Sequence, residues 1–353
     1  MSFPRLEKMS FRPKEEIIVF DSFGELLDKG LLLFGAEKSR KENCRYFFRG
    51  ECAFYDYPDP GIFRGFLSKE KEIFQHALNH CPNLFRHAGT TFDKLCEMDH
   101  YGFPARLLDV SSDLAMSWFM AVDGMHLKDL LSNLHSGNFY YWPGVLVIRV
   151  PESRIKFVDS DLVSILSNVA RMNKSFNLGE LFHEVKQERV NADRDYFDVE
   201  DFSSNWLVYP RLDNSRVKRQ KGAFILHGLL PEVCSDLLKK GINGKGDRNV
   251  DKETKDLKTN SAFPQMPVDF RGNNKNDIVR CARLVPSENY YREIVESVRK
   301  GASSYQDIAR LRTALDNFKQ KVFDELSFVG GGEIEAYEDD YFRQSNVCRA
   351  KHK

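Results

Sequence analysis

Long apolar runs are scarce in this sequence. The longest one near the N-terminus, from Leu31 to Phe34, is far shorter than the roughly 20 residues that a transmembrane helix needs. The opening residues, MSFPRLEKMSFRPKEE, lack the apolar centre of a signal peptide, so we expect no such peptide. These absences argue against a membrane-spanning or secreted protein and favour a cytoplasmic one that has no membrane partner.

Paired cysteines and a net charge are missing as well. The seven cysteines form no C-x-x-C pair, and their number is odd. This argues against a disulfide framework and against a zinc site, so we expect reduced thiols and no metal. The formal net charge is +0, so no overall field attracts nucleic acid, although a local basic patch is compatible with that balance.

Several common catalytic signatures do not occur. No glycine-rich phosphate loop of the G-x-x-x-x-G-K-[ST] or G-x-G-x-x-G type follows a strand-like segment, and G-x-S-x-G is absent. His183-Glu184 has no second histidine four residues later, which excludes the zinc-protease motif. Any chemistry that this chain performs therefore needs a different arrangement of residues.

The composition is typical of a globular protein, with 42% hydrophobic and 12% aromatic residues in 353 positions. Segments with the period of strands and of helices are interspersed, which predicts an α+β fold. The segments predicted as strands are 45–50, 144–150, 222–227 and 278–285. Helices are predicted at 67–78, 161–172, 178–190 and 290–298 and from residue 308 onward, whereas 205–211 is predicted to be irregular.

The stretch from Glu97 to Val122 organises the chain. A helix ends at the turn His-Tyr-Gly-Phe-Pro, residues 100–104, where glycine and proline interrupt helical geometry. Ala105 to Val110 is predicted to be a short buried strand. Ser111-Ser112-Asp113 then predicts the N-cap of a helix, where backbone N–H groups and the helix dipole favour anions such as phosphate.

Composition divides the chain into four parts. Residues 1–40 are a helical or extended lead-in, and residues 41–238 form the core that holds the motifs. Residues 239–277 are rich in Lys, Asp, Asn and Gly without apolar periodicity, which predicts a flexible charged insertion. Residues 278–353 supply a strand and helices that complete or flank the core.

Arg49 is a candidate ligand-binding residue. It follows three aromatic residues and precedes Gly50, so a ligand could approach the backbone closely beside its guanidinium. The fixed fork of donors in arginine suits the pyrophosphate of a dinucleotide, so we expect Arg49 to serve binding rather than folding. The alternative is a surface or ion-paired arginine at the end of a strand.

Other candidates also leave alternatives open. Arg106 and Asp109 are three residues apart, so on a strand they would point to opposite faces and could each anchor a buried ion pair. Asp109 could instead face a cleft or cap the next helix. His100 could be a general base and Tyr101 a stacking ring, or both could be ordinary turn and core residues. The basic run from Arg216 to Gly222 could contact phosphate or be a solvated loop.

Three blocks of the sequence, in this order, resemble the FRG-domain family. The first is Phe48-Arg49-Gly50, which matches the motif that names the family. The second, from Asp99 to Ser111, matches Q-H-Y-G-x-P-T-R-L-L-D-W-T. Asp99, Ala105 and Val110 replace its Gln, its first Thr and its Trp, and Ser111 replaces its final Thr. The third, RVKRQKGAF at residues 216–224, matches R-I-x-x-Q-x-G-x-F.

This resemblance implies an ADP-ribosyltransferase-like fold, in which helices surround a split mixed β-sheet, and NAD as the substrate. It places Arg49 on the NAD phosphates, with Gly50 and Arg106 in the same binding set. It places Tyr101, Asp109 and Ser111 around the nicotinamide ribose.

The same resemblance places Gln220 near the position of a catalytic glutamate, so the implied catalytic set is Arg49, Asp109 and Gln220. An amide carries no charge and cannot replace a carboxylate. Either another acid, such as Asp109 or Glu188, supplies the charge, or the domain binds without catalysing.

Three functional hypotheses remain. The first is a toxin that uses NAD to ADP-ribosylate RNA or another macromolecule in a bacterial anti-phage toxin–antitoxin system, with an antitoxin protein as a partner. The second is a non-catalytic FRG module that binds a nucleotide or a nucleic acid. The third is an interaction protein whose C-terminal helix and acidic tail dock a partner.

Overall fold

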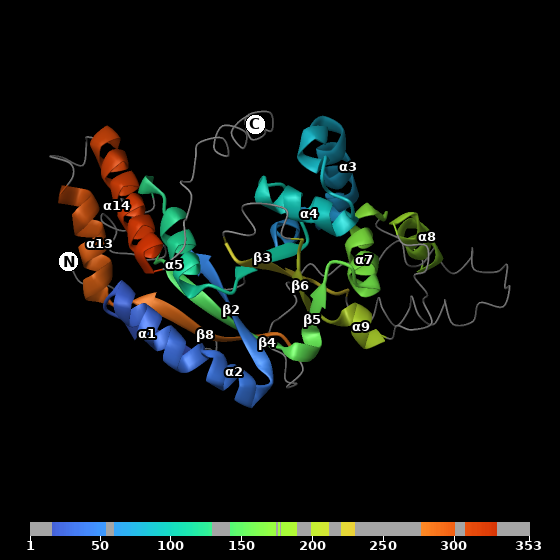
Figure 1. Ribbon diagram of the computed structural model, residues 1–353. Coiled ribbons are helices and arrows are strands. Elements are labelled where there is room, and N and C mark those ends of the chain that lie inside the picture. Colours follow the sequence, from blue (N-terminus) through green and yellow to red (C-terminus); the bar gives the residue numbers. More distant parts are fainter. Residues whose placement is uncertain are drawn as a thin grey trace.

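A computed structural model describes residues 16–53, 60–128, 142–173, 176, 178–188, 199–211, 220–229, 277–300 and 308–329 (Figure 1). These residues form one eight-stranded sheet with helices packed against it, which confirms the predicted α+β class. The strand order is β1-β8-β4-β2-β3-β7-β6-β5. The strands are β1 (Glu16–Phe20), β2 (Cys44–Glu51), β3 (Leu107–Ser111), β4 (Gly144–Pro151), β5 (Ile155–Phe157), β6 (Trp206–Tyr209), β7 (Gly222–Leu226) and β8 (Val279–Pro286).

The sheet is mixed, because β1 pairs with β8 and β5 with β6 in parallel, while the remaining neighbours are antiparallel. Strand β8 comes from the C-terminal part of the sequence and lies between β1, from the lead-in, and β4. The two ends of the described chain therefore share one sheet with the central region. Residues 239–276 of the predicted insertion lie outside the described residues.

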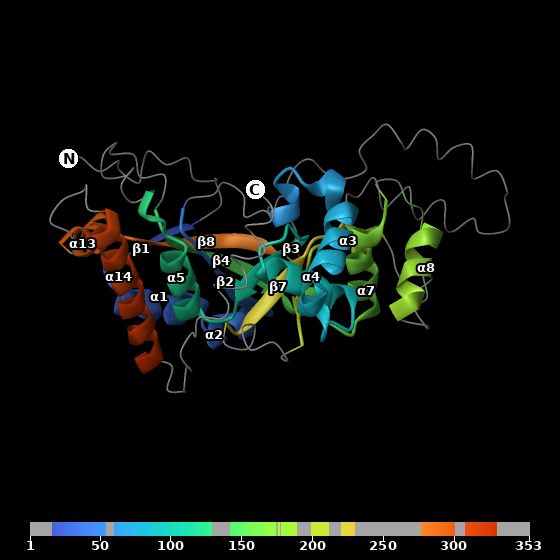
Figure 2. The same ribbon diagram turned by 90° about the horizontal axis from the view of Figure 1, so that it is seen from above.

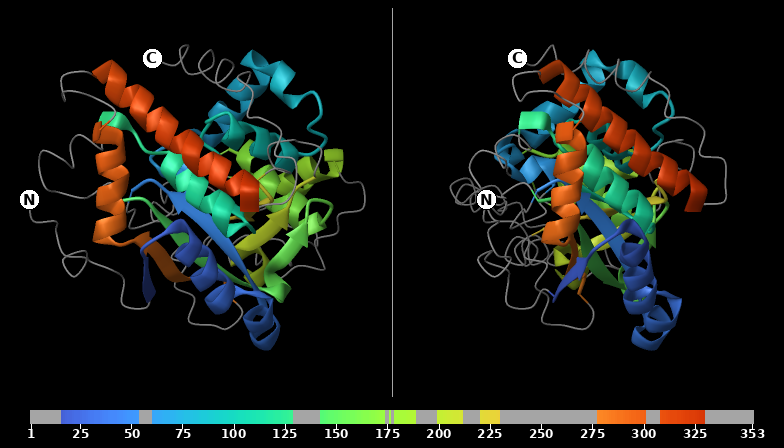
Figure 3. Two further views of the ribbon diagram at one scale, coloured as in Figure 1. Left: turned by 60° about the vertical axis from the view of Figure 1, so that its left-hand side comes forward. Right: turned by 90° about the vertical axis from the view of Figure 1, so that its left-hand side faces the viewer.

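One face of the sheet carries two separate groups of helices (Figure 2). The first group covers β1, β8, β4 and β2 and consists of α1 (Phe23–Phe34), α5 (Leu114–Asp123), α13 (Glu288–Lys300) and α14 (Ile308–Val329). Helix α14 lies alongside α5, where the ring centroids of Phe119 and Phe323 are 5.4 Å apart (Figure 3). A short helix, α2 (Ala36–Glu42), leads from α1 into β2.

The second group of helices covers β3, β7 and β6. It consists of α3 (Glu70–His80), α4 (Thr91–His100), α7 (Asp161–Asn168), α8 (Leu178–Glu188) and α9 (Val199–Ser203). Leu107, Phe224 and Trp206 from the strands pack into this core. A third cluster, which includes Phe47 and Leu146, lies on the opposite face of the sheet.

The sheet is weakly joined between β2 and β3. Strand β2 pairs with β4 along its whole length, from Cys44 to Glu51, but with β3 only through Phe48 and Ser111. Beyond that pair, towards the end of β2 and the start of β3, the two strands share no further backbone pairing in the described chain. Side chains from both faces can meet at this β2–β3 junction.

The predicted local signals around the central stretch are confirmed. Helix α4 ends at His100, and Gly102 has a φ of 79°, which glycine tolerates, in the turn that follows. The strand begins at Leu107 and extends to Ser111, one residue beyond its predicted end. Asp113 caps α5 by accepting a hydrogen bond from the N–H of Met116.

One predicted element is wrong. Residues 205–211 were expected to be irregular, but Trp206–Tyr209 is strand β6, buried between β5 and β7. Its four residues are too few for a periodic signal, and pairing on both edges determines its conformation. The helix predicted from residue 67 begins at Glu70, after a 3-10 turn at Leu67–Lys69.

Buried His227 makes the stability of this fold depend on pH. Its side chain is 1% exposed and its ring lies 5.5 Å from that of Phe63. Burial lowers the pKa of His227 to about 3 from the usual 6.5, so the imidazole is neutral in the folded protein. Below the unfolded-state pKa, the unfolded chain binds a proton that the folded chain does not, so stability is lost as the pH falls from about 6.5 towards 3.

We expect this histidine alone to reduce the free energy of unfolding by about 2 kcal/mol between about pH 7 and about pH 5. Urea titrations at the two pH values measure this change. In His227→Gln, the free energy of unfolding should differ between the two pH values by that much less than in the wild type. The control is His87→Gln, because His87 is exposed. If His227→Gln loses as much stability between the two pH values as the wild type does, His227 is not the cause of the pH dependence.

Candidate functional site

Arg49 lies in β2 and reaches Asp109 in β3 at the β2–β3 junction. Its Nη1 donates to the backbone carbonyl of Asp109 at 2.8 Å and also to the Oδ1 of the same residue. The side chains are 17% and 31% exposed, so the pair lies at the boundary of the interior. The first and second motif blocks, separated by about 60 positions, thus meet through one arginine and one aspartate.

Two further charged residues extend this pair inward. Glu51 Oε1 is 3.8 Å from Arg49 Nε, and Glu51 Oε2 accepts a hydrogen bond from Arg283 Nη1 at 2.8 Å. The side chains of Glu51 and Arg283 are each 2% exposed. Arg49, Glu51, Asp109 and Arg283 are called the charge cluster below. It holds two cations and two carboxylates, so its formal charge is zero.

The faces of the sheet explain why the cluster forms only at this junction. Side chains alternate along a strand, so Arg49 and Glu51 share the face of Phe47, opposite α5. Asp109 pairs with Phe224, which packs into the core on the helix-covered face. Arg49 and Asp109 start from opposite faces and can meet only where the strands separate.

The electrostatics of Arg49 reflect both its burial and its neighbours. Burial acts to lower the pKa of Arg49, but the carboxylates of Asp109 and Glu51 outweigh it, so the pKa is raised above its usual value. Arg49 is therefore a permanent cation. Among the described residues, Arg49 Nε and Glu51 Oε1 are buried and have no hydrogen-bond partner. These two atoms face each other at 3.8 Å, as an ion pair without a hydrogen bond.

Gly50 is explained by packing. A Cβ atom at this position would lie 1.9 Å from the backbone oxygen of Ser117 and 2.6 Å from the backbone nitrogen of Ala121. Helix α5 therefore packs its backbone directly on β2 at Gly50. The close approach that the sequence suggested for a ligand is made by α5, the helix that follows the second motif block.

We expect Gly50→Ala to cost about 3 kcal/mol of stability or more, because α5 would have to move away from β2. Gly24→Ala is the matched control, since the nearest atom to a Cβ there is the hydroxyl oxygen of Ser22 at 3.9 Å. That position is helical, so alanine should be neutral or slightly stabilising. Thermal unfolding of both variants measures the difference, and equal melting temperatures would contradict this packing role.

Arg106 forms a separate buried ion pair. It precedes β3, and its Nε donates to Glu70 Oε1 at 2.8 Å while its Nη2 contacts Glu70 Oε2. Both side chains are less than a tenth exposed. This is the ion-pair alternative for Arg106, and it anchors α3 to the start of β3. Arg106 thus belongs to a different ion pair from those of the charge cluster.

Ser111 and Gln220 meet, but through the backbone of Gln220. Ser111 Oγ donates to the carbonyl of Gln220 at 2.6 Å and accepts from the N–H of Asp113 at 2.9 Å. Because Ser111 pairs with Gly222, Gln220 lies beyond the C-terminal end of β3, on the other side of that pair from Asp109. Residues 216–219 of the basic run lie outside the described residues.

Tyr101 and Glu188 occupy other parts of the second helix group. Tyr101 follows α4, is partly exposed and packs against the core of that group. Glu188 in α8 accepts hydrogen bonds from the N–H of Thr91 at 3.0 Å and from Asn168 Nδ2 at 3.2 Å. Its carboxylate therefore satisfies the N-terminus of α4, which gives it a structural role.

The capping alternative for Asp109 is wrong. Asp109 is the third residue of β3, and Asp113 caps α5. The sequence also left three charged residues unrecognised: Glu51, Arg283 and Glu70. Glu51 could have been found, since it is two residues from Arg49 on the same face of a strand. Arg283 lies in an apolar strand, which indicates that its charge has a buried partner. No residue near it in the sequence identifies that partner.

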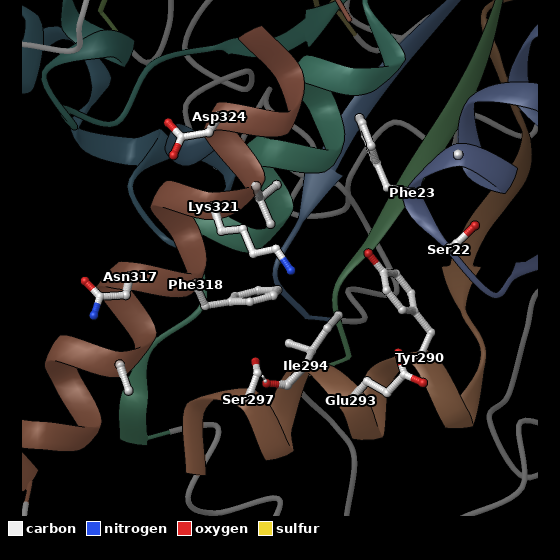
Figure 4. Close-up of a pocket in the computed structure, with 13 residues that line it drawn as sticks. Ser22, Phe23, Tyr290, Glu293, Ile294, Ser297, Asn317, Phe318, Lys321 and Asp324 are labelled. Atoms are coloured by element: carbon white, nitrogen blue, oxygen red, sulfur yellow. Dashed lines mark hydrogen bonds between the residues drawn. The ribbon is translucent and has the colours of Figure 1, made fainter. Parts of the chain in front are cut away.

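A groove lies apart from the charge cluster, between α13, α14 and the start of α1 (Figure 4). It has a volume of about 1050 Å³. Phe23, Ile294 and Phe318 supply apolar surface, and Tyr290 and Lys321 supply polar atoms along it. None of its lining residues belongs to the charge cluster.

The burial of Arg49 revises its expected role, because it contributes to folding as well. We expect Arg49→Met to lower the free energy of unfolding by about 3 kcal/mol, since it removes the cation between two carboxylates. Arg45→Met is the matched control on the same strand. Arg45 pairs with Glu152 at 2.8 Å, but its side chain is 53% exposed, so its loss should cost about 1 kcal/mol or less.

A double variant tests the pairing directly. Arg49→Met combined with Asp109→Leu should be less destabilised than the sum of the single variants, which chemical denaturation can measure. Additive effects, or equal losses for Arg49→Met and Arg45→Met, would contradict the proposed coupling.

By fold, the chain belongs to the class of mixed α+β proteins with a single large sheet. Comparison with family models, with curated proteins and with solved structures found no match. In the parts of the chain that the structure describes, no helix is long and apolar enough to cross a bilayer, and no three metal-ligating side chains gather.

Proposed function

We propose that this chain is an NAD-dependent ADP-ribosyltransferase that modifies a macromolecule, with the charge cluster as its active site. The observation that carries the proposal is the Arg49–Asp109 pair, which joins the Phe-Arg-Gly block to the block from Asp99 to Ser111. In the FRG-domain resemblance these are the blocks that bind NAD. The separation of β2 from β3 is consistent with the split sheet of ADP-ribosyltransferases.

NAD fits the donors and acceptors of this site as a substrate. Arg49 is a permanent cation whose side chain is 17% exposed at the junction, and a phosphate oxygen would pair with its guanidinium. A phosphate would also compete with the Asp109 carboxylate for the same guanidinium. Binding would then release Asp109 from Arg49 and leave its carboxylate near the ligand.

In the proposed reaction, the bond between nicotinamide and ribose breaks and its electron pair leaves with neutral nicotinamide. Positive charge develops on the ribose, and the Asp109 carboxylate stabilises it. A nucleophile of the acceptor then bonds to the same carbon and loses a proton. Asp109 is preferred over Gln220 as the acid, because Gln220 has no charge and lies on the far side of the Ser111–Gly222 pair.

The acceptor that we propose is RNA, and the setting is a bacterial anti-phage toxin–antitoxin system in the cytoplasm, with an antitoxin protein as the partner. The non-catalytic alternative would use the same cluster to bind a nucleotide without turnover. The partner-docking alternative would instead use the groove between α13 and α14.

Asp109→Asn separates catalysis from binding and folding. We expect it to lower the rate of NAD consumption at least 100-fold, because the amide cannot stabilise the developing charge. The matched control is Asp113→Asn, since an asparagine caps a helix about as well as an aspartate and α5 should remain intact. Its rate should stay within about threefold of the wild type.

The measurement uses NAD labelled in the adenylate part, incubated with a cell lysate and followed by nuclease or protease digestion to identify the labelled polymer. Calorimetry reports NAD binding separately. Binding of NAD without turnover by the wild type would favour the non-catalytic module. The proposal is refuted if the wild type shows no NAD binding and no NAD turnover. It is also refuted if Asp109→Asn keeps full activity.

A further inference from the structure

Arg283 lies in β8, two strands away from Arg49, yet both arginines approach the carboxylate of Glu51. Arg49 pairs with Leu146 in β4, and Leu146 pairs with Arg283, so the three residues form one row across the sheet. Residues opposite each other on antiparallel strands point to the same face, and the two arginines therefore start from one face about 10 Å apart. Glu51 lies between their guanidinium groups.

Gly144 leaves room for the Arg283 side chain to reach Glu51. This glycine is the residue of β4 that pairs with Glu51, and it places no side chain on the shared face. A Cβ atom there would lie 3.9 Å from Cγ of Arg283, so the aliphatic part of Arg283 passes beside Gly144. Arg283 Nη1 then donates to Glu51 Oε2 at 2.8 Å.

Arg283 has no direct access to a ligand at the β2–β3 junction. Its side chain is 2% exposed, as is that of Glu51, and β4 and β2 separate its strand from the junction. Arg49 is 17% exposed, so it is the arginine of this row that a ligand can reach. An effect of Arg283 on ligand binding therefore passes through Glu51.

The charges of the cluster explain what Arg283 contributes. Arg49 lies between the carboxylates of Asp109 and Glu51. One cation and two carboxylates carry a formal charge of −1, which would repel a phosphate group. Arg283 brings the formal charge of the cluster to zero. It also holds one oxygen of Glu51, so that Glu51 competes less strongly for the Arg49 guanidinium.

We propose that Arg283 is a positioning residue for anion binding at the charge cluster. By engaging Glu51, it keeps the Arg49 guanidinium available to the diphosphate of a nucleotide. The identification of that nucleotide as NAD rests on the proposed function. The positioning role itself does not require turnover, because binding of a nucleoside diphosphate to Arg49 can be measured without any reaction.

Calorimetric titration with ADP, which carries the pyrophosphate of NAD, tests this role. Arg283→Met leaves Glu51 paired with Arg49 alone and should weaken ADP binding about tenfold. Glu51→Gln removes a competing carboxylate from Arg49 and should strengthen ADP binding about threefold. The double variant has the same formal cluster charge as the wild type, so its affinity should lie within about twofold of the wild-type value.

Arg45→Met is the matched control, because it removes an arginine of the same sheet with the same change in net charge. Arg45 is 53% exposed and pairs with Glu152, outside the charge cluster, so ADP affinity should not change. Thermal unfolding gives a temperature at which the variants are folded. A purely structural role for the pair predicts weaker binding in both single variants, so the sign of the Glu51→Gln effect decides even if Arg283→Met does not fold.

The outcomes separate this role from the transferase proposal. Opposite effects of the two single variants support it, and so does recovery in the double variant. The role is refuted if the wild type binds no ADP, if Arg283→Met binds ADP as well as the wild type, or if Glu51→Gln binds it no more tightly. NAD turnover by the wild type would leave the transferase proposal intact in those cases. The expected pattern of ADP binding without NAD turnover would support the positioning role and favour the non-catalytic module.

Discussion

The placement of ionised groups in the interior is the constraint on which the rest of this structure depends. Glu51 and Arg283 are almost completely buried, and removing either charge would take a buried counterion from the other. The loss of hydration is offset only while the pair keeps its geometry. That geometry requires β8, which carries Arg283, to lie beside β4, and β4 to lie beside β2, which carries Glu51. The cluster thus ties the C-terminal part of the chain to the first motif block.

The same constraint shapes the chemistry available at the β2–β3 junction. Arg49 is already neutralised by Asp109 and lies close to Glu51, so an anionic ligand has to compete for it. In the proposed mechanism, binding of the ligand to Arg49 is therefore coupled to the release of Asp109. A neutral cluster also fits a chain with a net charge of +0, because the attraction for phosphate is local and acts only at short range.

Packing at Gly50 complements the electrostatics. Helix α5 contacts β2 through its backbone, which fixes the second motif block against the first. The buried pair between Arg106 and Glu70 holds the start of β3 against α3 in the other helix group. Strand β3 is consequently held at both ends, and Asp109 lies between these two anchors. Its position is therefore determined by contacts on both sides of the junction.

The sequence by itself determined the elements whose signals are local. Short runs of aromatic and apolar residues predicted β2, β4, β7 and β8, the helical period predicted α14, and the cap cluster that ends in Asp113 was identified by residue type. It also identified Arg49 and Asp109 as candidates. Only the tertiary structure decided that they form a pair, that Gly50 contacts α5, and that Arg283 reaches Glu51 across 232 positions of sequence. The physical reason is that a buried charge requires a counterion, but its identity and its side of the sheet depend on strand order and register, which local sequence does not encode.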